Sequence, residues 1–121
     1  MPSISVFKAF RIAVERQDFH GRATRTVVQV KGEVDVATSA HLATAIAQAM
    51  ARAMEKEPAG NVDLVIDLAH LSFIDVSGIN VLVRAACQAR ACGGALVLRS
   101  PNRSVRRLLD VLRLDAVLAV E

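Results

Sequence analysis

The residue types that could carry chemistry gather in one short segment of this sequence, Asp75-Val76-Ser77-Gly78. The segment follows an apolar run that includes VIDL and precedes an apolar pattern with helical spacing. A serine at the start of a helix can cap it, because the hydroxyl oxygen accepts a hydrogen bond from a free backbone amide. The same place suits a phosphate, which would meet free amides and the positive end of the helix dipole. The residues alone leave both interpretations of Ser77 open.

A phosphate on Ser77 would change the surface charge more than the fold. Phosphorylation adds about two negative charges, and the start of a helix tolerates them. Burying that dianion beside Asp75 in an interface would cost far more than the contact that it replaces. Any switch at Ser77 is therefore expected to act on the binding of a partner.

Catalysis by Ser77 is the competing chemistry, and it would need a general base. The sequence places His70 in a predicted loop just before Ser77. No G-x-S-x-G elbow surrounds the serine, however. The acids Asp35, Asp67 and Asp75 lack the spacing of a metal site. We therefore expect a protein that is not an enzyme and that holds no cofactor and no metal.

The length and the charge of the chain limit its class. With 121 residues it fits one domain, residues 1–121 with a core at about 8–120. Its net charge of +3 is spread along the sequence, and only four arginines lie together, Arg103, Arg106, Arg107 and Arg113. This pattern, with only 3% aromatic residues, argues against nucleic acid as a partner. No apolar run approaches the roughly 20 residues that cross a bilayer, so we expect a cytoplasmic protein without a membrane partner.

Turn signals and hydrophobic periodicity predict elements in the order β-β-α-β-α-β-α-β. The predicted strands span residues 10–16, 26–30, 62–68, 95–99 and 116–120, with turns at His20-Gly21-Arg22 and Pro58-Ala59-Gly60-Asn61. The predicted helices span residues 39–56, run from Ser77-Gly78 to Gly93-Gly94, and begin again at Pro101-Asn102. A hairpin followed by alternating helices and strands indicates a single α/β domain. Its central sheet should be mixed, with mostly parallel later strands, and packed with amphipathic helices.

Each predicted helix has one apolar face that should pack on the sheet. The inward residues expected for the first helix are Leu42, Ile46, Ala49, Met50, Ala53 and Met54. Those expected for the second helix are Ile79, Leu82, Val83 and Ala86, and those for the third are Val105, Leu108, Leu109 and Leu112. For the cap of the first helix we favour Thr38 or Ser39 over Asp35.

The two cysteines, Cys87 and Cys92, are five residues apart in the second predicted helix. Their side chains would point about 140° apart around the axis, which argues against a disulfide in the intact helix. We interpret both as small apolar fillers, with Cys87 buried beside Val83 and Ala86 and Cys92 more reactive near the helix end. A redox role, mainly of Cys92, stays open.

The segment FIDVSG, after a VIDL strand and with GEVD at residues 32–35 upstream, resembles the STAS domain of anti-sigma factor antagonists. The resemblance covers roughly residues 8–120 and includes the order of elements. It maps the phosphorylated serine of that family, which immediately precedes a glycine, onto Ser77, and the acid two residues earlier onto Asp75. Asp35 matches the acid of the upstream segment. Many members carry Ser or Thr where this chain has Val76, which leaves Ser77 without a neighbouring phosphoacceptor.

The resemblance implies a partner-switching cycle. The unphosphorylated protein would bind an anti-sigma factor with a histidine-kinase-like ATPase fold and so release the sigma factor. That serine kinase would phosphorylate Ser77 with Mg-ATP, and a PPM-type phosphatase would restore the free serine. The expected partner-binding residues are Asp35, Asp75, Val76, Ser77, Gly78, Asn80 and Arg84, with Gln88 and Arg90 at the rim. The alternative is a STAS subunit of a lipid-transport complex or a ligand-sensing STAS module.

Overall fold

Five strands form one mixed sheet in the computed structural model, which describes residues 10–18, 24–56 and 62–121. The strands are β1 (Arg11–Asp18), β2 (Thr24–Val34), β3 (Asp63–Ile74), β4 (Ala95–Arg99) and β5 (Ala119–Val120). They lie in the sheet in the order in which they follow one another in the sequence. β1 pairs with β2 antiparallel, and the later pairs are parallel. The predicted α/β class and the mixed sheet are confirmed.

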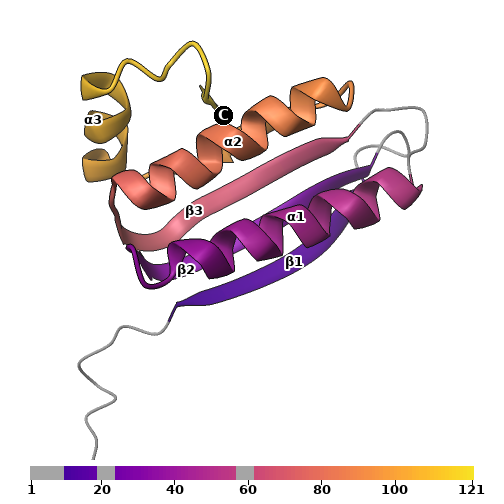
Figure 1. Ribbon diagram of the computed structural model, residues 1–121, viewed down its shortest axis with the longest axis horizontal. Helices are drawn as coiled ribbons and strands as arrows, with labels where there is room; N and C mark the ends of the chain where they lie inside the picture. Colours follow the sequence, from indigo (N-terminus) through magenta and orange to yellow (C-terminus); the bar gives the residue numbers. More distant parts are fainter. Residues whose placement is uncertain (1–9, 19–23, 57–61) are drawn as a thin grey trace, which may run out of the picture.

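Three helices connect the parallel strands, α1 (Ser39–Lys56), α2 (Val76–Ala91) and α3 (Arg103–Val111). Right-handed crossovers that step across a sheet in the same direction place their helices on the same face. Accordingly α1 and α2 lie side by side over the sheet, while α3 lies at the end of the molecule where α2 begins (Figure 1). None of these helices combines the length and the apolar content needed to span a bilayer.

The core lies between the sheet and the helices. Alternate strand residues point toward the helices and are buried, among them Val28, Val30, Leu64, Ile66, Leu68, Leu96 and Leu98. The helices meet them with Leu42, Ile46, Met50, Ile79, Leu82, Val105 and Leu109. The aliphatic composition therefore gives a core of interdigitated branched side chains, as close packing requires.

Residues 69–74, which we predicted as a loop, form the last part of β3 instead. This part pairs with the end of β2, where Gly32 lies opposite Leu71 and Val34 opposite Ile74. The pairing contains two register shifts, and Gly32 adopts a φ of 91°, which favours glycine. His70 is consequently an exposed strand residue and not a loop residue. The predicted turns at residues 20–22 and 58–61 lie outside the described residues.

Several predictions about individual buried positions are wrong. Met54 is 45% exposed and Leu112 is 38% exposed, whereas Val83 and Leu108 are partly buried and pack against the core. Cys87, which was expected to be buried, is exposed, and Cys92 is the more protected thiol, with its Sγ atom 3.8 Å from Met54 Sδ. The inward stripe of α2 runs through Ala85, Ala86 and Ala89. Because each helical residue turns by about 100°, Cys87 lies beyond the edge of that stripe.

Candidate functional site

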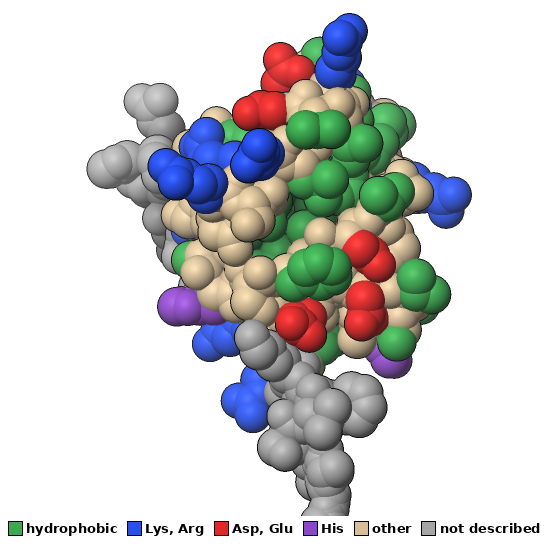
Figure 2. Space-filling model, turned by 90° about the vertical axis from the view of Figure 1, so that its left-hand side faces the viewer, with side chains coloured by type: hydrophobic (Ala, Val, Ile, Leu, Met, Phe, Trp, Pro, Cys, Tyr) green, Lys and Arg blue, Asp and Glu red, His purple; other side chains and the backbone are tan. Residues whose placement is uncertain are grey.

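The carboxyl ends of β2 and β3 meet beside the start of α2. The Asp75 amide donates to the carbonyl oxygen of Val34 over 3.0 Å. Asp35 and Asp75 therefore follow the ends of neighbouring parallel strands. This end of the molecule faces the viewer in Figure 2, where acidic side chains border a patch of apolar ones.

Asp75, and not Ser77, caps α2. Its carboxylate Oδ1 accepts from the Gly78 amide at 3.2 Å, and its carbonyl accepts from the Ile79 amide at 3.0 Å. Ser77 is already inside the helix, and its hydroxyl donates to the same Asp75 Oδ1. The capping interpretation of Ser77 is therefore wrong, although its place in the first turn of a helix is as predicted. The hydrogen bond fixes the direction of a hydroxyl that would otherwise rotate freely.

Asp75 is an anion at neutral pH. The hydrogen bond from the Ser77 hydroxyl, helped by the backbone amides of Gly78, Ser77 and Asp75 itself, lowers the pKa of this carboxyl below its ordinary value. Partial burial opposes the shift but is the smaller effect. The Ser77 hydroxyl is thus held against a full negative charge.

Gly78 allows α2 to lie close to the strand ends. A Cβ atom built on Gly78 would lie 2.5 Å from Ile74 Cγ1 and 2.6 Å from Val34 Cγ1. Real Cβ atoms do not approach other atoms so closely, and both neighbours belong to the core. The glycine after Ser77 is therefore needed for packing, and it brings the serine to the meeting point of β2 and β3.

Asp35 holds the turn between β2 and α1. Its Oδ1 accepts from the amides of Ala37 at 2.9 Å and Thr38 at 3.2 Å. The Thr38 hydroxyl in turn accepts from the Asp35 amide at 3.0 Å. Ser39 takes no such part, because its hydroxyl donates to the Val36 carbonyl at 3.4 Å. The preference for Thr38 or Ser39 over Asp35 is therefore wrong, because the side chain that accepts from the amides just before α1 is that of Asp35, which the Thr38 hydroxyl supports.

Residues of α2 before and after Ser77 in the sequence line two surface grooves. The first groove runs between α1 and α2 and has a volume of about 250 Å³. Its lining residues are Ala43, Ile46, Ala47, Val81, Arg84, Ala85 and Gln88. Arg84 follows Ser77 by seven residues on α2, so both lie on the same face of the helix. Asn80 and Arg90 are exposed nearby along α2.

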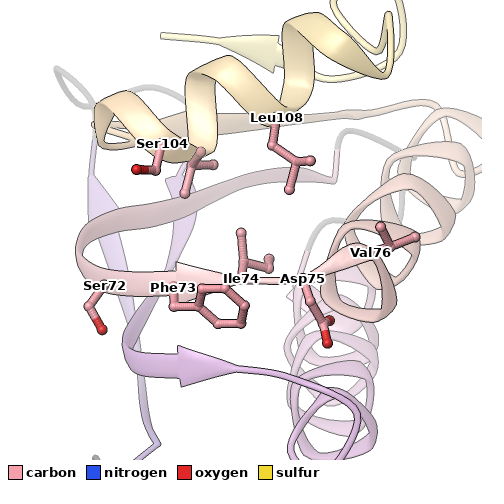
Figure 3. A pocket seen from close by; sticks show the side chains of 8 residues that line it. Ser72, Phe73, Ile74, Asp75, Val76, Ser104 and Leu108 are labelled. Atoms are coloured by element: carbon pink, nitrogen blue, oxygen red, sulfur yellow. The ribbon is translucent and has the colours of Figure 1, made fainter.

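The second groove runs between the end of β3 and α3 and has a volume of about 380 Å³. It is lined by Ser72, Phe73, Ile74, Asp75, Val76, Ser104, Val105 and Leu108 (Figure 3). Phe73 was not among the predicted site residues, yet 49% of it is exposed. The sequence feature that could have identified Phe73 as a site residue is its position, two residues before the acid of the DVSG segment.

The described residues give little support to a metal site or to catalysis by a histidine base. Among residues 10–18, 24–56 and 62–121, no three His, Cys, Asp or Glu side chains come together as a metal site would require. His70 is exposed on β3. His41 stacks on Phe10, with 6.4 Å between the ring centroids.

Solved structures with the same fold include several anti-sigma factor antagonists. One from Mycobacterium paratuberculosis shares 24% identity with a TM-score of 0.69, over 91% of this chain and 85% of that chain. The Bacillus cell fate determinant SpoIIAA in its phosphorylated form shares 20% identity with a TM-score of 0.60, over 93% and 91%. The murine anion transporter Slc26a9 also matches, with 16% identity and a TM-score of 0.60, over 93% of this chain but 20% of the transporter. At these identities the likeness concerns the fold.

The family model described as the STAS domain matches residues 11–121. That range takes in all five strands, all three helices and the Asp75–Ser77 pair. The sequence motifs, the fold and this match agree. The chain belongs to the STAS domain family.

Proposed function

We propose that this protein is an anti-sigma factor antagonist that is switched by phosphorylation of Ser77. The observation that carries the proposal is the Ser77 hydroxyl, oriented by the Asp75 carboxylate in the first turn of α2. A domain that served only for packing would have no need of a hydroxyl held in this way. The unphosphorylated protein binds an anti-sigma factor with a histidine-kinase-like ATPase fold, and the sigma factor is released.

In the phosphoryl transfer, this chain is the substrate. Ser77 Oγ forms a bond to the γ-phosphorus of ATP on the anti-sigma factor, the bond between the β- and γ-phosphates breaks, and ADP leaves. The lowered pKa of Asp75 makes its carboxylate a weak proton acceptor at neutral pH. Asp75 therefore orients the hydroxyl, while the general base that takes the proton, the Mg²⁺ ion and the ATP belong to the kinase.

Phosphorylation changes binding because it concentrates negative charge. The dianion would stand beside Asp75 and close to the strand end that carries Asp35. Within the described residues, neither carboxylate has an ion pair with a cation. The positive end of the α2 dipole tolerates the phosphate within the fold. A partner surface that fits the neutral hydroxyl would have to bury an uncompensated charge, and it dissociates.

The site also suits removal of the phosphate by a PPM-type phosphatase. Ser77 is only half-buried, and residues of α2 before and after it line two open grooves. The bond between phosphorus and Ser77 Oγ is therefore accessible to a second enzyme once the anti-sigma factor has left. Partner binding and dephosphorylation would use the same surface in turn.

Binding of two Ser77 variants to the anti-sigma factor tests the proposal. Ser77→Ala keeps the surface neutral and should bind within a few-fold of the wild type. Ser77→Asp adds a charge beside Asp75 and should bind about 100-fold more weakly, since burying a charge that has no partner in the interface costs several kcal/mol. Gln48→Asp, on an exposed position of α1, is the control for added charge. Equal dissociation constants for the wild type, Ser77→Ala and Ser77→Asp in titration calorimetry would exclude charge at Ser77 as the switch.

A further inference from the structure

We infer that the groove between β3 and α3 receives an apolar side chain of the anti-sigma factor, carried on a segment with basic residues that face Asp35 and Asp75. We call it the Phe73 groove and define it by Ser72, Phe73, Asp75, Val76, Ser104 and Leu108. The inference rests on the proposed function and extends it, because it names the contact that would hold the partner over Ser77.

Several side chains that line the Phe73 groove are apolar and remain exposed to solvent. Phe73 is 49% exposed and Val76 is 53% exposed, and Leu108 is only partly buried. Figure 3 shows Leu108 on α3 pointing across the groove toward the end of β3, where Phe73 lies. Clustered apolar side chains that remain in water mark a binding surface, whereas single ones do not.

The apolar surface continues along α3. Ser104, Leu108 and Val111 are spaced by four and three residues, so they share one face of the helix. Val111 is 70% exposed, and Leu112 beside it is 38% exposed. In Figure 2 the apolar side chains accordingly form a continuous patch on this end of the molecule. An extended segment or a helix of a partner fits such a strip better than a small molecule does.

Charge indicates the chemistry of the occupant. The rim on the side of the strand ends carries Glu33, Asp35 and Asp75, none of which has an ion pair with a described cation. Across the patch, exposed Arg103 and Arg107 lie four residues apart on α3. In Figure 2, acidic side chains border the lower right of the patch, and Lys and Arg side chains lie at its upper left, next to further acidic ones at the top. A complementary segment is basic where it meets Asp35 and Asp75.

The groove lies next to Ser77, so a partner side chain bound in the groove would lie close to the phosphorylation site. Asp75 and Val76 line the groove and directly precede Ser77 in the chain. An apolar side chain seated against Val76 would bring the ATPase surface over the Ser77 hydroxyl. The basic residues of the partner would already be paired with Asp35 and Asp75, so a phosphate on Ser77 would add negative charge that nothing in the interface compensates. Contacts in the groove therefore stabilise the complex, and the phosphorylation state of Ser77 determines whether the complex can form.

The test compares Phe73→Ala with a matched variant, Met54→Ala. Both residues are about half exposed, but Met54 lies on α1, outside the groove. The probe is a purified histidine-kinase-like anti-sigma factor that phosphorylates the wild type with Mg-ATP. We expect Phe73→Ala to weaken binding about tenfold or more, as loss of an aromatic anchor does, and to raise KM for phosphorylation more than it lowers kcat. Met54→Ala should match the wild type, and circular dichroism should show both variants folded.

The possible outcomes separate the two proposals. If the wild type is phosphorylated on Ser77 while Phe73→Ala and Met54→Ala bind alike, the groove is not the docking site and the proposed function stands. If Arg84→Ala, in the groove between α1 and α2, weakens binding and Phe73→Ala does not, the partner uses that other groove. If no such anti-sigma factor binds or phosphorylates the wild type, the proposed function fails and this inference fails with it.

Discussion

The starts of α2 and α3 are built from the same parts. Each helix has an Asx cap whose side-chain oxygen accepts from the amide three residues on, Gly78 to Asp75 at 3.2 Å and Val105 to Asn102 at 2.9 Å. Each also carries a serine two residues after the cap, Ser77 in α2 and Ser104 in α3. Sequence position at a helix start therefore does not distinguish the two serines.

What surrounds the two serines differs. The Asp75 cap is an anion that accepts a hydrogen bond from Ser77, whereas no hydrogen bond joins Ser104 to its neutral Asn102 cap in the described structure. Acids border Ser77, and arginines border Ser104. A serine in the first turn of a helix becomes a candidate switch only when its hydroxyl is oriented and when new charge there would be uncompensated. Ser104 serves as an internal control for Ser77.

The largest expected difference is in phosphoryl transfer. With the anti-sigma factor and Mg-ATP, Ser77→Ala should take up no phosphate, while Ser104→Ala, although its side chain lines the Phe73 groove, should still take up phosphate on Ser77. Intact-mass analysis and peptide mapping give the answer. Phosphate on Ser104 or Ser72 of the Ser77→Ala protein, at the rate of the wild type, would contradict the assignment.

Alanine at the position after each serine should lower the stability of the protein, but for opposite reasons at the two positions. Gly78→Ala forces a Cβ into Ile74 and Val34 and should destabilise the protein by about 1–3 kcal/mol through overpacking. Val105→Ala, at a residue 2% exposed, should cost a similar amount, about 1–3 kcal/mol, through a cavity. Urea unfolding measures both changes. An unchanged free energy of unfolding for Gly78→Ala would show that α2 can move away from the strand ends.

Exchanging Asp and Asn at the two cap positions should change the stability of the protein little at neutral pH and more in acid. Asn and Asp cap about equally well, so Asp75→Asn and Asn102→Asp should each change stability by less than about 1 kcal/mol at pH 7. The pKa of Asp75 is lowered in the folded protein, so its carboxylate contributes stability above the ordinary aspartate range, and this contribution is lost as the pH falls through the folded pKa.

The unfolding free energy of the wild type should therefore fall more steeply below about pH 4 than that of Asp75→Asn. Glu121, whose pKa is lowered chiefly by a hydrogen bond from Arg25, contributes a loss of the same sign in both proteins and cancels in the comparison. Parallel pH profiles for the two proteins would mean that Asp75 is not specially stabilised as an anion.

The sequence allowed the main elements to be predicted where hydrophobic periodicity was strong. The predicted helix at residues 39–56 has the observed bounds of α1, Ser39–Lys56. The order of elements, the hairpin and the parallel strands were also predictable, because each helix separates two apolar runs. Asp35 and Asp75 were predicted as site residues from the resemblance, and the structure places them just after the ends of the neighbouring parallel strands β2 and β3.

Other features depended on tertiary context. The last part of β3 exposes Ala69, His70, Ser72 and Phe73, which breaks the alternation expected of a strand. The assignment of the cap could not be made from DVSG, because Asp and Ser cap equally well and only the observed start of α2 at Val76 decides between them. The Phe73 groove requires α3 to be placed against β3, and no local pattern encodes that contact.

Phosphate on Ser77 is expected to remove the affinity of this protein for the anti-sigma factor. The most direct measurement is titration calorimetry of one wild-type preparation before phosphorylation, after complete phosphorylation of Ser77, and after treatment with a PPM-type phosphatase. We predict tight binding, a loss of about 100-fold or more, and full recovery, since burying a charge that has no partner in the interface costs several kcal/mol. Equal dissociation constants for the phosphorylated and unphosphorylated protein would contradict it.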